Sequence, residues 1–255
     1  MAKQTYNENG AILWRGKSAL DGSPIVLIAT GLKLGSANAK TGNLVQTWIL
    51  SDTMTPQEAV DSGADFAICG DCPHRGIVVD GKNVGRACYV TIFQAPRNIF
   101  STYKRGRYKN HIASAKELLA GHSIRLGAYG DPAAIPFEVW ESMLDMRQSH
   151  TGYTHQWKTA DSRFSRVCMA SADKPQEAQE AQALDYRTFR VGMKADEKRR
   201  DLKEFLCPAS KEAGVKTNCA ACLACGGHSS KNAASVFIPV HGSIAKMNQF
   251  GKVAE

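Results

Sequence analysis

Short apolar runs separated by polar and amphipathic stretches predict that strands and helices alternate along most of the chain. The apolar runs are rich in β-branched and aromatic residues and are bounded by Gly, Pro, Asp or Ser, which is typical of strands. The pattern predicts strands at residues 25–30, 47–50, 66–69, 88–92, 124–129, 153–157, 166–170, 188–191 and 236–240.

The stretches between several of these runs predict helices. Residues 55–63 begin with Thr-Pro and end with Gly, which places a capping hydroxyl, a proline in the first turn and a terminating glycine in the expected order. Residues 95–103, 136–147 and 175–184 also begin at or beside a proline, and residues 136–147 are amphipathic. Helices therefore follow strands in sequence, as in βα units.

This alternation predicts an α/β fold with a largely parallel sheet. The eight to nine expected strands suit a TIM-type (β/α) barrel or an incomplete barrel, and a doubly wound open sheet is the alternative. We expect residues 1–255 to form a single domain. Residues 194–230 break the alternation and are interpreted as a Cys-rich metal-binding segment inserted before the last strand.

Composition narrows the classes of partner. A net charge of +8 over 255 residues favours anionic partners such as nucleic acid, nucleotides or phosphorylated substrates. No apolar run is long enough to cross a membrane, and the polar start of the chain lacks the apolar centre of a signal peptide. Eight cysteines in such a chain predict a reducing cytoplasm, where thiols bind metals rather than form disulfides.

The strongest chemical motif is a run of three cysteines, Cys219, Cys222 and Cys225, with Cys207 twelve residues upstream of the first. Two consecutive Cys-x2-Cys spacings place three thiolates on one tight loop, as a four-iron cluster requires. Four thiolates also suit a closed tetrahedral zinc site. We predict a metal centre here, with iron–sulfur favoured because zinc sites more often combine separate Cys-x2-Cys pairs.

A second cysteine group lies upstream and comprises Cys69, Cys72 and Cys88, with His74 close by in sequence. Three thiolates with His74 suit a structural zinc site, whereas three thiolates alone leave one metal position open, as in catalytic sites. The sequence does not decide between these two. The remaining cysteine, Cys168, lies in an apolar run and is expected to pack in the core.

Three polar residues follow or end predicted strands and are the candidate catalytic residues. In parallel α/β folds the chemistry gathers where strands end. Asp131 is a candidate acid, base or nucleophile, His155 a candidate proton carrier, and Arg190 a candidate bidentate partner for an anionic group. We expect the three side chains to line one cavity. Asp131 could instead cap a helix, and His155 could lie in the core.

Four phrases of the sequence are similar to a family of cysteine-rich bacteriophage proteins that has no assigned activity. They are Cys-Gly-Asp-Cys-Pro-His-Arg at 69–75, Gly-Ala-Tyr-Gly-Asp-Pro-Ala-Ala-Ile-Pro at 127–136, Thr-Gly-Tyr-Thr-His-Gln-Trp at 151–157 and Cys-Pro-Ala-Ser at 207–210. The resemblance covers residues 24–241. It implies a phage gene product that acts in a bacterial cytoplasm, and it implies that both cysteine groups belong to the family pattern while Cys168 does not.

Two functions fit these patterns. The first is a metal-containing enzyme that acts on a nucleotide, a nucleic acid or another anionic substrate. The second is a non-catalytic module for binding nucleic acid, stabilised by zinc or an iron–sulfur cluster. Residues 103–109 combine four cations with two tyrosines, which is compatible with phosphate contact and base stacking. The polar residues at strand ends favour the enzyme.

Overall fold

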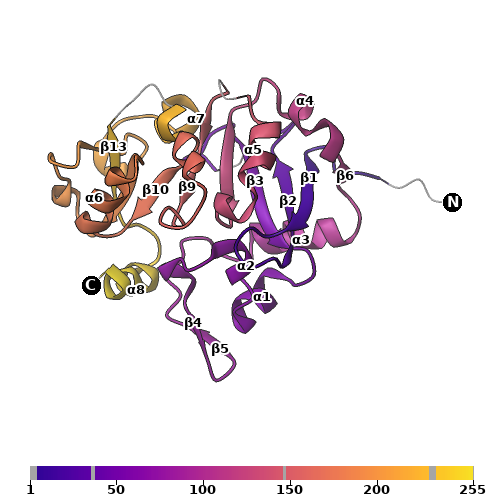
Figure 1. The fold of residues 1–255 in the computed structure, drawn as a ribbon, viewed down its shortest axis with the longest axis horizontal. Helices are drawn as coiled ribbons and strands as arrows, with labels where there is room; N and C mark the ends of the chain where they lie inside the picture. The colour runs from indigo at the N-terminus through magenta and orange to yellow at the C-terminus, as the bar shows by residue number, and fades with distance from the viewer. Residues whose placement is uncertain (1–4, 36–37, 146–147, 230–233, 255) are drawn as a thin grey trace.

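The computed structural model describes residues 5–35, 38–145, 148–229 and 234–254. Their strands form two large sheets that lie side by side, the first built from the N-terminal half of the chain and the second from the C-terminal half (Figure 1). A two-stranded hairpin of β4 (Ile77–Val79) and β5 (Lys82–Val84) projects below them. The chain is therefore mixed α/β, as predicted.

The first sheet combines antiparallel and parallel pairing. Strands β1, β2 and β3 are antiparallel neighbours, whereas β7 joins β3, and β8 joins β7, in parallel. The short strand β6 runs parallel to β1 at the edge. In the described residues this sheet has the order β6 (Lys109–Asn110), β1 (Gly10–Lys17), β2 (Pro24–Thr30), β3 (Val45–Ser51), β7 (Ile124–Tyr129), β8 (His150–Thr151).

The second sheet is parallel throughout its described strands. Its order is β12 (Glu204–Leu206), β13 (Ser235–Pro239), β11 (Thr188–Gly192), β10 (Met169–Ala172), β9 (Tyr153–Thr154). Only Gly152 separates β8 from β9, so one segment supplies an edge strand to each sheet. A Cβ on Gly152 would lie 2.8 Å from the Cys168 sulfur, so this close junction requires glycine.

The helices lie at strand ends and over the sheets. Helix α1 has the expected capping box, in which the Thr55 hydroxyl accepts from the Glu58 N–H and the Glu58 carboxylate accepts from the Thr55 N–H. The described α-helices are α1 (Pro56–Ser62), α2 (Phe66–Cys69), α3 (Ala95–Lys104), α4 (Ala115–Leu119), α5 (Phe137–Met143), α6 (Pro175–Ala183), α7 (Cys219–Cys222) and α8 (Ile244–Ala254).

The structure corrects several expectations. The strands form open sheets in the described residues, and no TIM-type barrel is seen. The strand expected at 66–69 is helix α2, because a run of four apolar residues between glycines fits either element. Residues 88–92 form a loop, and the Cys88 N–H donates to His74 rather than to a sheet. The helix expected at 136–147 ends at Met143, and residues 146–147 lie outside the described chain.

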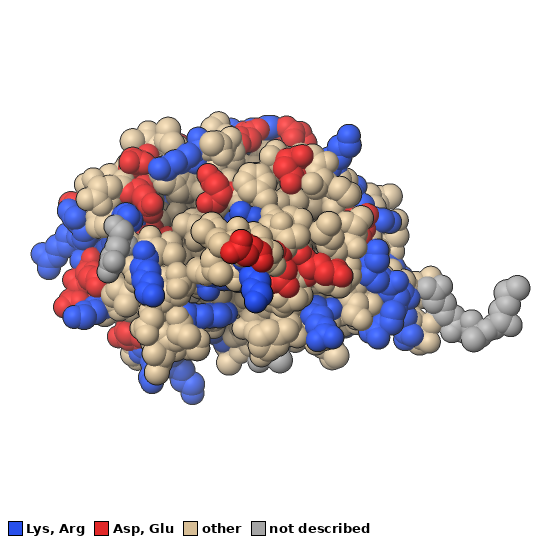
Figure 2. Space-filling view, turned by 90° about the horizontal axis from the view of Figure 1, so that it is seen from below, with Lys and Arg blue, Asp and Glu red and all other residues tan. Residues whose placement is uncertain are grey.

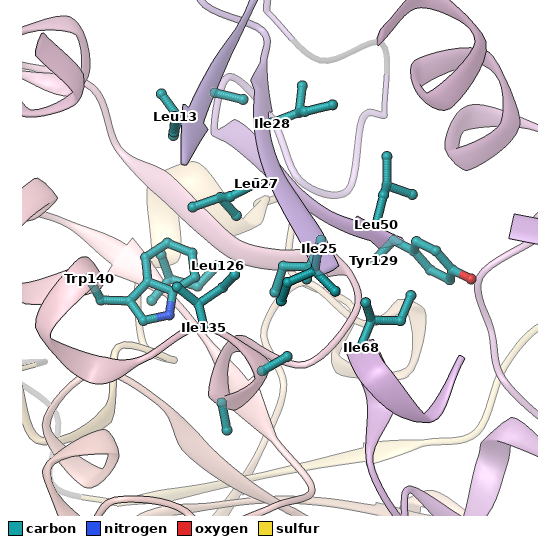
Figure 3. Packing of buried hydrophobic residues seen from close by; sticks show 14 of the residues in the cluster. Leu13, Ile25, Leu27, Ile28, Leu50, Ile68, Leu126, Tyr129, Ile135 and Trp140 are labelled. Atoms are coloured by element: carbon teal, nitrogen blue, oxygen red, sulfur yellow. The ribbon is translucent and has the colours of Figure 1, made fainter. Parts of the chain in front are cut away.

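The largest core cluster fills the space between the first sheet and helix α5 (Figure 3). The Trp140 side chain of α5 is fully buried, and its indole N–H donates to the Pro132 carbonyl over 2.9 Å. Leu126 of β7 and Ile135 lie close to it. Cys168 is completely buried in the same cluster, which confirms its predicted packing role. This core holds β7 in place, and residue 131 is the second residue after that strand.

Candidate functional site

A cavity of about 360 Å³ opens where the parallel strands of the two sheets end. Its wall includes residues that follow β7, β9, β10 and β13, as expected for parallel α/β sheets. Its apolar part is formed by side chains of β11 and β13: Phe189, Val191, Val236 and Ile238. Seven of the eight cysteines line this cavity: Cys69, Cys72, Cys88, Cys207, Cys219, Cys222 and Cys225. All eight are free thiols.

The downstream cysteine group is held by backbone hydrogen bonds to two distant parts of the chain. Cys207 follows β12, and its N–H donates to the Phe237 carbonyl of β13. Cys219 begins the short helix α7, which Asn218 caps by accepting the Ala221 N–H. The Cys219 N–H in turn donates to the Lys40 carbonyl. Backbone hydrogen bonds therefore fix the cysteine loop to both sheets.

The buried guanidinium of Arg187 holds the same loop from behind. It donates to the carbonyls of Ala224, Gly227 and Ala234, at distances of 2.5–3.0 Å. Its side chain is buried, so these three carbonyls replace water as its partners. Sequence reasoning missed Arg187, because nothing in its local pattern shows that it reaches a loop about forty residues away.

The upstream cysteine group is assembled around the His74 carbonyl. Cys69 ends helix α2, and Cys72 precedes the 3₁₀ helix Pro73–Arg75. The His74 carbonyl accepts the N–H groups of both Ala87 and Cys88, which brings Cys88 back beside the Cys-x2-Cys pair. Cys69, Cys72 and Cys88 are close enough for their thiolates to interact electrostatically with one another. The three thiols thus lie on the same side of the cavity, and a shared metal site for them stays a prediction.

Burial controls the protonation of these thiols. Loss of water raises the pKa of Cys72 to about 12 and that of Cys225 to about 12, and it raises the pKa of Cys69 well above its ordinary value. Opposing this, the backbone N–H two residues further on donates to the sulfur of Cys72, Cys88 and Cys207. Donors aimed at sulfur stabilise the thiolate form.

Cations lie beside both cysteine groups. Lys40 interacts with Cys207 and Cys219, and burial lowers the pKa of Lys40 while these thiolates oppose the shift. Arg125 lies near Cys219 on the same side of the cavity. Arg86 and Lys246 take the corresponding place beside Cys88. Each thiolate group therefore has its own two positive charges. Sequence reasoning missed all four: Lys40, Arg125 and Lys246 lie far along the chain from the cysteines beside them, and Arg86 lies two residues before Cys88.

The spacing of the sulfurs separates two kinds of metal centre. Sulfurs bound to one zinc ion at ~2.3 Å stand about 4 Å apart. Among the described residues, no three cysteine sulfurs lie within 4.8 Å of one another. Sulfurs that bind different corner irons of a cubane cluster stand farther apart than sulfurs that share one ion. The arrangement is therefore wider than a closed zinc site.

A different donor group does meet this distance limit. His74, His155 and Asp173 each offer one ligand atom, and the three atoms lie within 4.8 Å of one another. The His74 Nε2 lies 2.7 Å from the Asp173 Oδ2, and the His74 and His155 rings meet edge to face at 5.4 Å. All three side chains line the cavity. His74 thus lies with His155 and Asp173, and not only with the cysteines that precede it in sequence.

Asp131 lies in the cavity wall, and its carboxylate accepts hydrogen bonds from two backbone N–H groups. Its Oδ1 accepts the Ala133 N–H over 2.9 Å, and its Oδ2 accepts the His155 N–H over 2.8 Å. Burial raises its pKa, while these donors oppose the shift. The turn that places it needs Gly130, which has a positive φ of 81° and no room for a Cβ beside Ile49. Asp131 therefore positions His155.

The expectation that Arg190 lines the same cavity is wrong. Phe189 and Val191 face the cavity, so Arg190 between them points to the other face of the sheet. There it is 2% exposed and forms a two-pronged ion pair with Glu204, with distances of 2.7 and 2.8 Å. Arg190 is thus a buried structural residue, and sequence alone could not assign its face.

The basic segment at residues 103–109 is not part of the cavity wall. Tyr103 and Tyr108 are buried, and Tyr103 donates to the Asp52 carboxylate, so neither ring is free to stack on a base. Figure 2 shows one face of the molecule, on which Lys and Arg are interspersed with Asp and Glu. In the part of the chain that the structure describes, no helix is long and apolar enough to cross a membrane.

Comparisons with known proteins leave the site to be interpreted from its own chemistry. Seven cysteines, three histidines and two aspartates from distant segments converge on one cavity, and Asp131 and His155 are two of the three residues predicted to meet there. The resemblance to bacteriophage proteins stays a prediction. Searches against protein-family models, curated proteins and solved structures find no match for this chain.

Proposed function

We propose that this chain is an iron–sulfur enzyme that acts on a small anionic molecule held in the cavity. The observation that carries the proposal is the convergence of seven free cysteines, in two groups, on one cavity. Thiols that serve only to fill a core have no reason to gather in this way, and Cys168 shows the alternative by packing alone in the apolar core.

The surroundings of the thiols fit an iron–sulfur cluster. Backbone N–H groups donate to the sulfurs of Cys72, Cys88 and Cys207. Hydrogen bonds to sulfur and burial are two of the features that tune such clusters. A thiolate cluster also carries negative charge, and each cysteine group has cations beside it. The wide sulfur spacing favours a cluster of several irons over a single zinc ion.

Each cysteine group has a separate role in this proposal. Four thiolates, those of Cys207, Cys219, Cys222 and Cys225, provide a complete set for one cluster. The upstream group provides three thiolates, which leaves one position without a cysteine ligand. Iron–sulfur centres supply one-electron transfer, and a centre with an open position can also bind substrate.

The walls of the cavity define the class of substrate. A volume of about 360 Å³ is at the lower end of the range for small-molecule sites, so a single nucleotide or a similar small anion is the right size. Lys40 and Arg125 line the cavity and can bind its negative charge. Phe189 and Ile238 supply an apolar surface for a base or another planar group. A nucleic-acid duplex is too large to enter.

The alternative is a non-catalytic module for binding nucleic acid, and it has less support. Such a module needs an exposed basic surface, whereas the face shown in Figure 2 mixes both signs of charge. The two tyrosines that could stack on bases are buried. We further propose, on the resemblance to bacteriophage proteins, that the enzyme acts in the cytoplasm of a bacterial host.

Anaerobic purification tests the proposal. The protein should be brown, should absorb broadly near ~400 nm, and should contain roughly four irons and four sulfides for each cubane centre. Cys222→Ser and Cys72→Ser should each lower iron and sulfide, one from each centre. Cys168→Ala is the matched control, because Cys168 lies outside the cavity, and it should keep the full content.

Two outcomes would contradict the proposal. One is a protein that stays colourless and free of sulfide after anaerobic reconstitution with iron and sulfide. The other is a loss of iron in Cys168→Ala as large as that in Cys222→Ser. A second measurement distinguishes the enzyme from the binding module. The protein with its full iron and sulfide content is given nucleotides and a chemical reductant, and turnover of a nucleotide is measured.

A further inference from the structure

Three side chains with oxygen and nitrogen donors meet in the cavity wall, and none of them is a cysteine. His74 lies in the 3₁₀ helix Pro73–Arg75, His155 directly follows β9, and Asp173 directly follows β10. They are separated by up to about a hundred residues, yet one ligand atom from each lies within 4.8 Å of the others. In the described residues, no other group of His, Cys, Asp and Glu meets this limit.

The distances within the group suit a common ion. The His74 Nε2 and the Asp173 Oδ2 are 2.7 Å apart. Two donors bound at ~2.1 Å at a right angle to each other stand about 3 Å apart, so these two atoms are already near that separation. One ligand atom of His155 lies within 4.8 Å of both, so all three donors are within reach of one ion.

The hydrogen-bonding capacity of His74 is not used up by the protein. Its Nδ1 is buried and has no hydrogen-bond partner among the described residues. A buried polar atom without a partner is costly. The Phe250 ring of α8 stacks on the imidazole at 5.3 Å and shields it from solvent. The Nε2 that faces Asp173 is therefore the candidate ligand atom, while the Nδ1 on the other side of the ring lies without a partner among the described residues in a place shielded from solvent.

Hydrogen bonds to carboxylates hold the backbone of two of the three residues. Asp131 accepts the His155 backbone N–H and fixes the start of the loop that carries this side chain. The Asp173 N–H donates to the Glu177 carboxylate over 2.8 Å at the beginning of α6. These contacts fix where the two side chains leave the backbone.

We propose that His74, His155 and Asp173 hold one divalent first-row metal ion. Two imidazoles and one carboxylate are a typical donor set for mononuclear iron(II) or catalytic zinc, and they leave coordination positions open. All three residues line the cavity, so the open positions face the substrate. An ion placed there would bind an oxygen of the anionic substrate as a Lewis acid. This site goes beyond the iron–sulfur centres and needs no cysteine.

Cobalt(II) is the probe for this site, because its visible spectrum reports the donor atoms. We expect the protein, purified with its iron–sulfur content intact, to bind one Co²⁺ with visible d–d bands and without the strong near-ultraviolet thiolate-to-cobalt band. His155→Gln and Asp173→Asn keep the size of each side chain and remove its role as a ligand. Each should weaken Co²⁺ binding at least tenfold, by analogy with losses of 10- to 100-fold for mutation of supporting residues alone.

Matched controls separate this site from others. His241→Gln changes another histidine of the cavity wall, one that lies beside Lys40, and should leave Co²⁺ binding unchanged. Cys222→Ser should lower the iron and sulfide content and leave the cobalt spectrum intact. The failure of one proposal can thus be told from the failure of the other.

Three results would overturn the inference. Wild-type protein could fail to bind Co²⁺ in a one-to-one ratio, the bound cobalt could show thiolate bands, or both substitutions could leave the affinity unchanged. Circular dichroism checks that each variant is folded. If Asp173→Asn does not fold, His155→Gln decides the question alone, because His155 is only partly buried and tolerates an amide of similar size.

Discussion

The buried ion pair between Arg190 and Glu204 allows a quantitative test of the fold. Replacing Arg190 with methionine keeps much of the side-chain volume and removes the charge. The Glu204 carboxylate is fully buried, and after the change it still accepts the Arg199 N–H over 2.8 Å but has lost both donors of the guanidinium. The perturbation therefore leaves a negative charge in the core without its cation.

The size of the effect follows from the contacts that are lost. Arg190 donates to both Glu204 oxygens and to the Glu197 carbonyl, and its guanidinium lies 4.5 Å from the centre of the Phe237 ring. Removing one partner of a buried pair typically costs about 3–5 kcal/mol. At about 4 kcal/mol, a protein of this size should melt about 8–16 °C lower.

A double substitution identifies the cause. Glu204→Gln removes the second charge while its amide oxygen can still accept the Arg199 N–H. Arg190→Met/Glu204→Gln should therefore be about 1–3 kcal/mol more stable than Arg190→Met. Thermal unfolding at matched metal content measures the stability of the wild-type protein, the two single variants and the double variant. The reasoning fails if Arg190→Met costs less than about 1 kcal/mol, or if the double variant is no more stable than Arg190→Met.

Three further predictions follow from the same structure. Because burial raises the pKa of Cys72 and Cys225 to about 12, both thiols are protonated near neutral pH, and metal loading should release protons. The apparent affinity for metal, measured by calorimetry, should therefore rise with pH by about tenfold per unit for each thiol that must ionise. An affinity that does not change with pH would contradict this. Lys40→Met should lower the reduction potential of the downstream centre, and Lys246→Met should lower that of the upstream centre. Each cation stabilises the more negative reduced state beside it. In a redox titration, each variant should shift the midpoint of one centre and leave that of the other unchanged. Trp140→Ala should destabilise the protein by about 3–5 kcal/mol in urea unfolding, because the indole is fully buried, and a loss below about 1 kcal/mol would be inconsistent with the packing seen.

Local features of this protein were determined by the sequence itself. Thr55, Pro56, Glu58 and Gly63 fix both ends of helix α1 through contacts within a few residues. Apolar runs placed β2, β7, β11 and β13 close to their observed bounds, because strands of this kind are bounded by nearby turn residues. The two cysteine groups could also be recognised from spacing alone. The mixed α/β class was predictable for the same reason.

Only the tertiary structure decided the relations between these parts. The antiparallel pairing of β1, β2 and β3 depends on which strand edges meet, and no local pattern shows that. The face on which Arg190 lies depends on a register that shifts every side chain when it changes by one residue. His74 lies near Cys72 in the chain, but it meets Asp173 across about a hundred residues. Short-range contacts set the elements, whereas the site arises from long-range packing of the two sheets, and sequence spacing contains no measure of those distances.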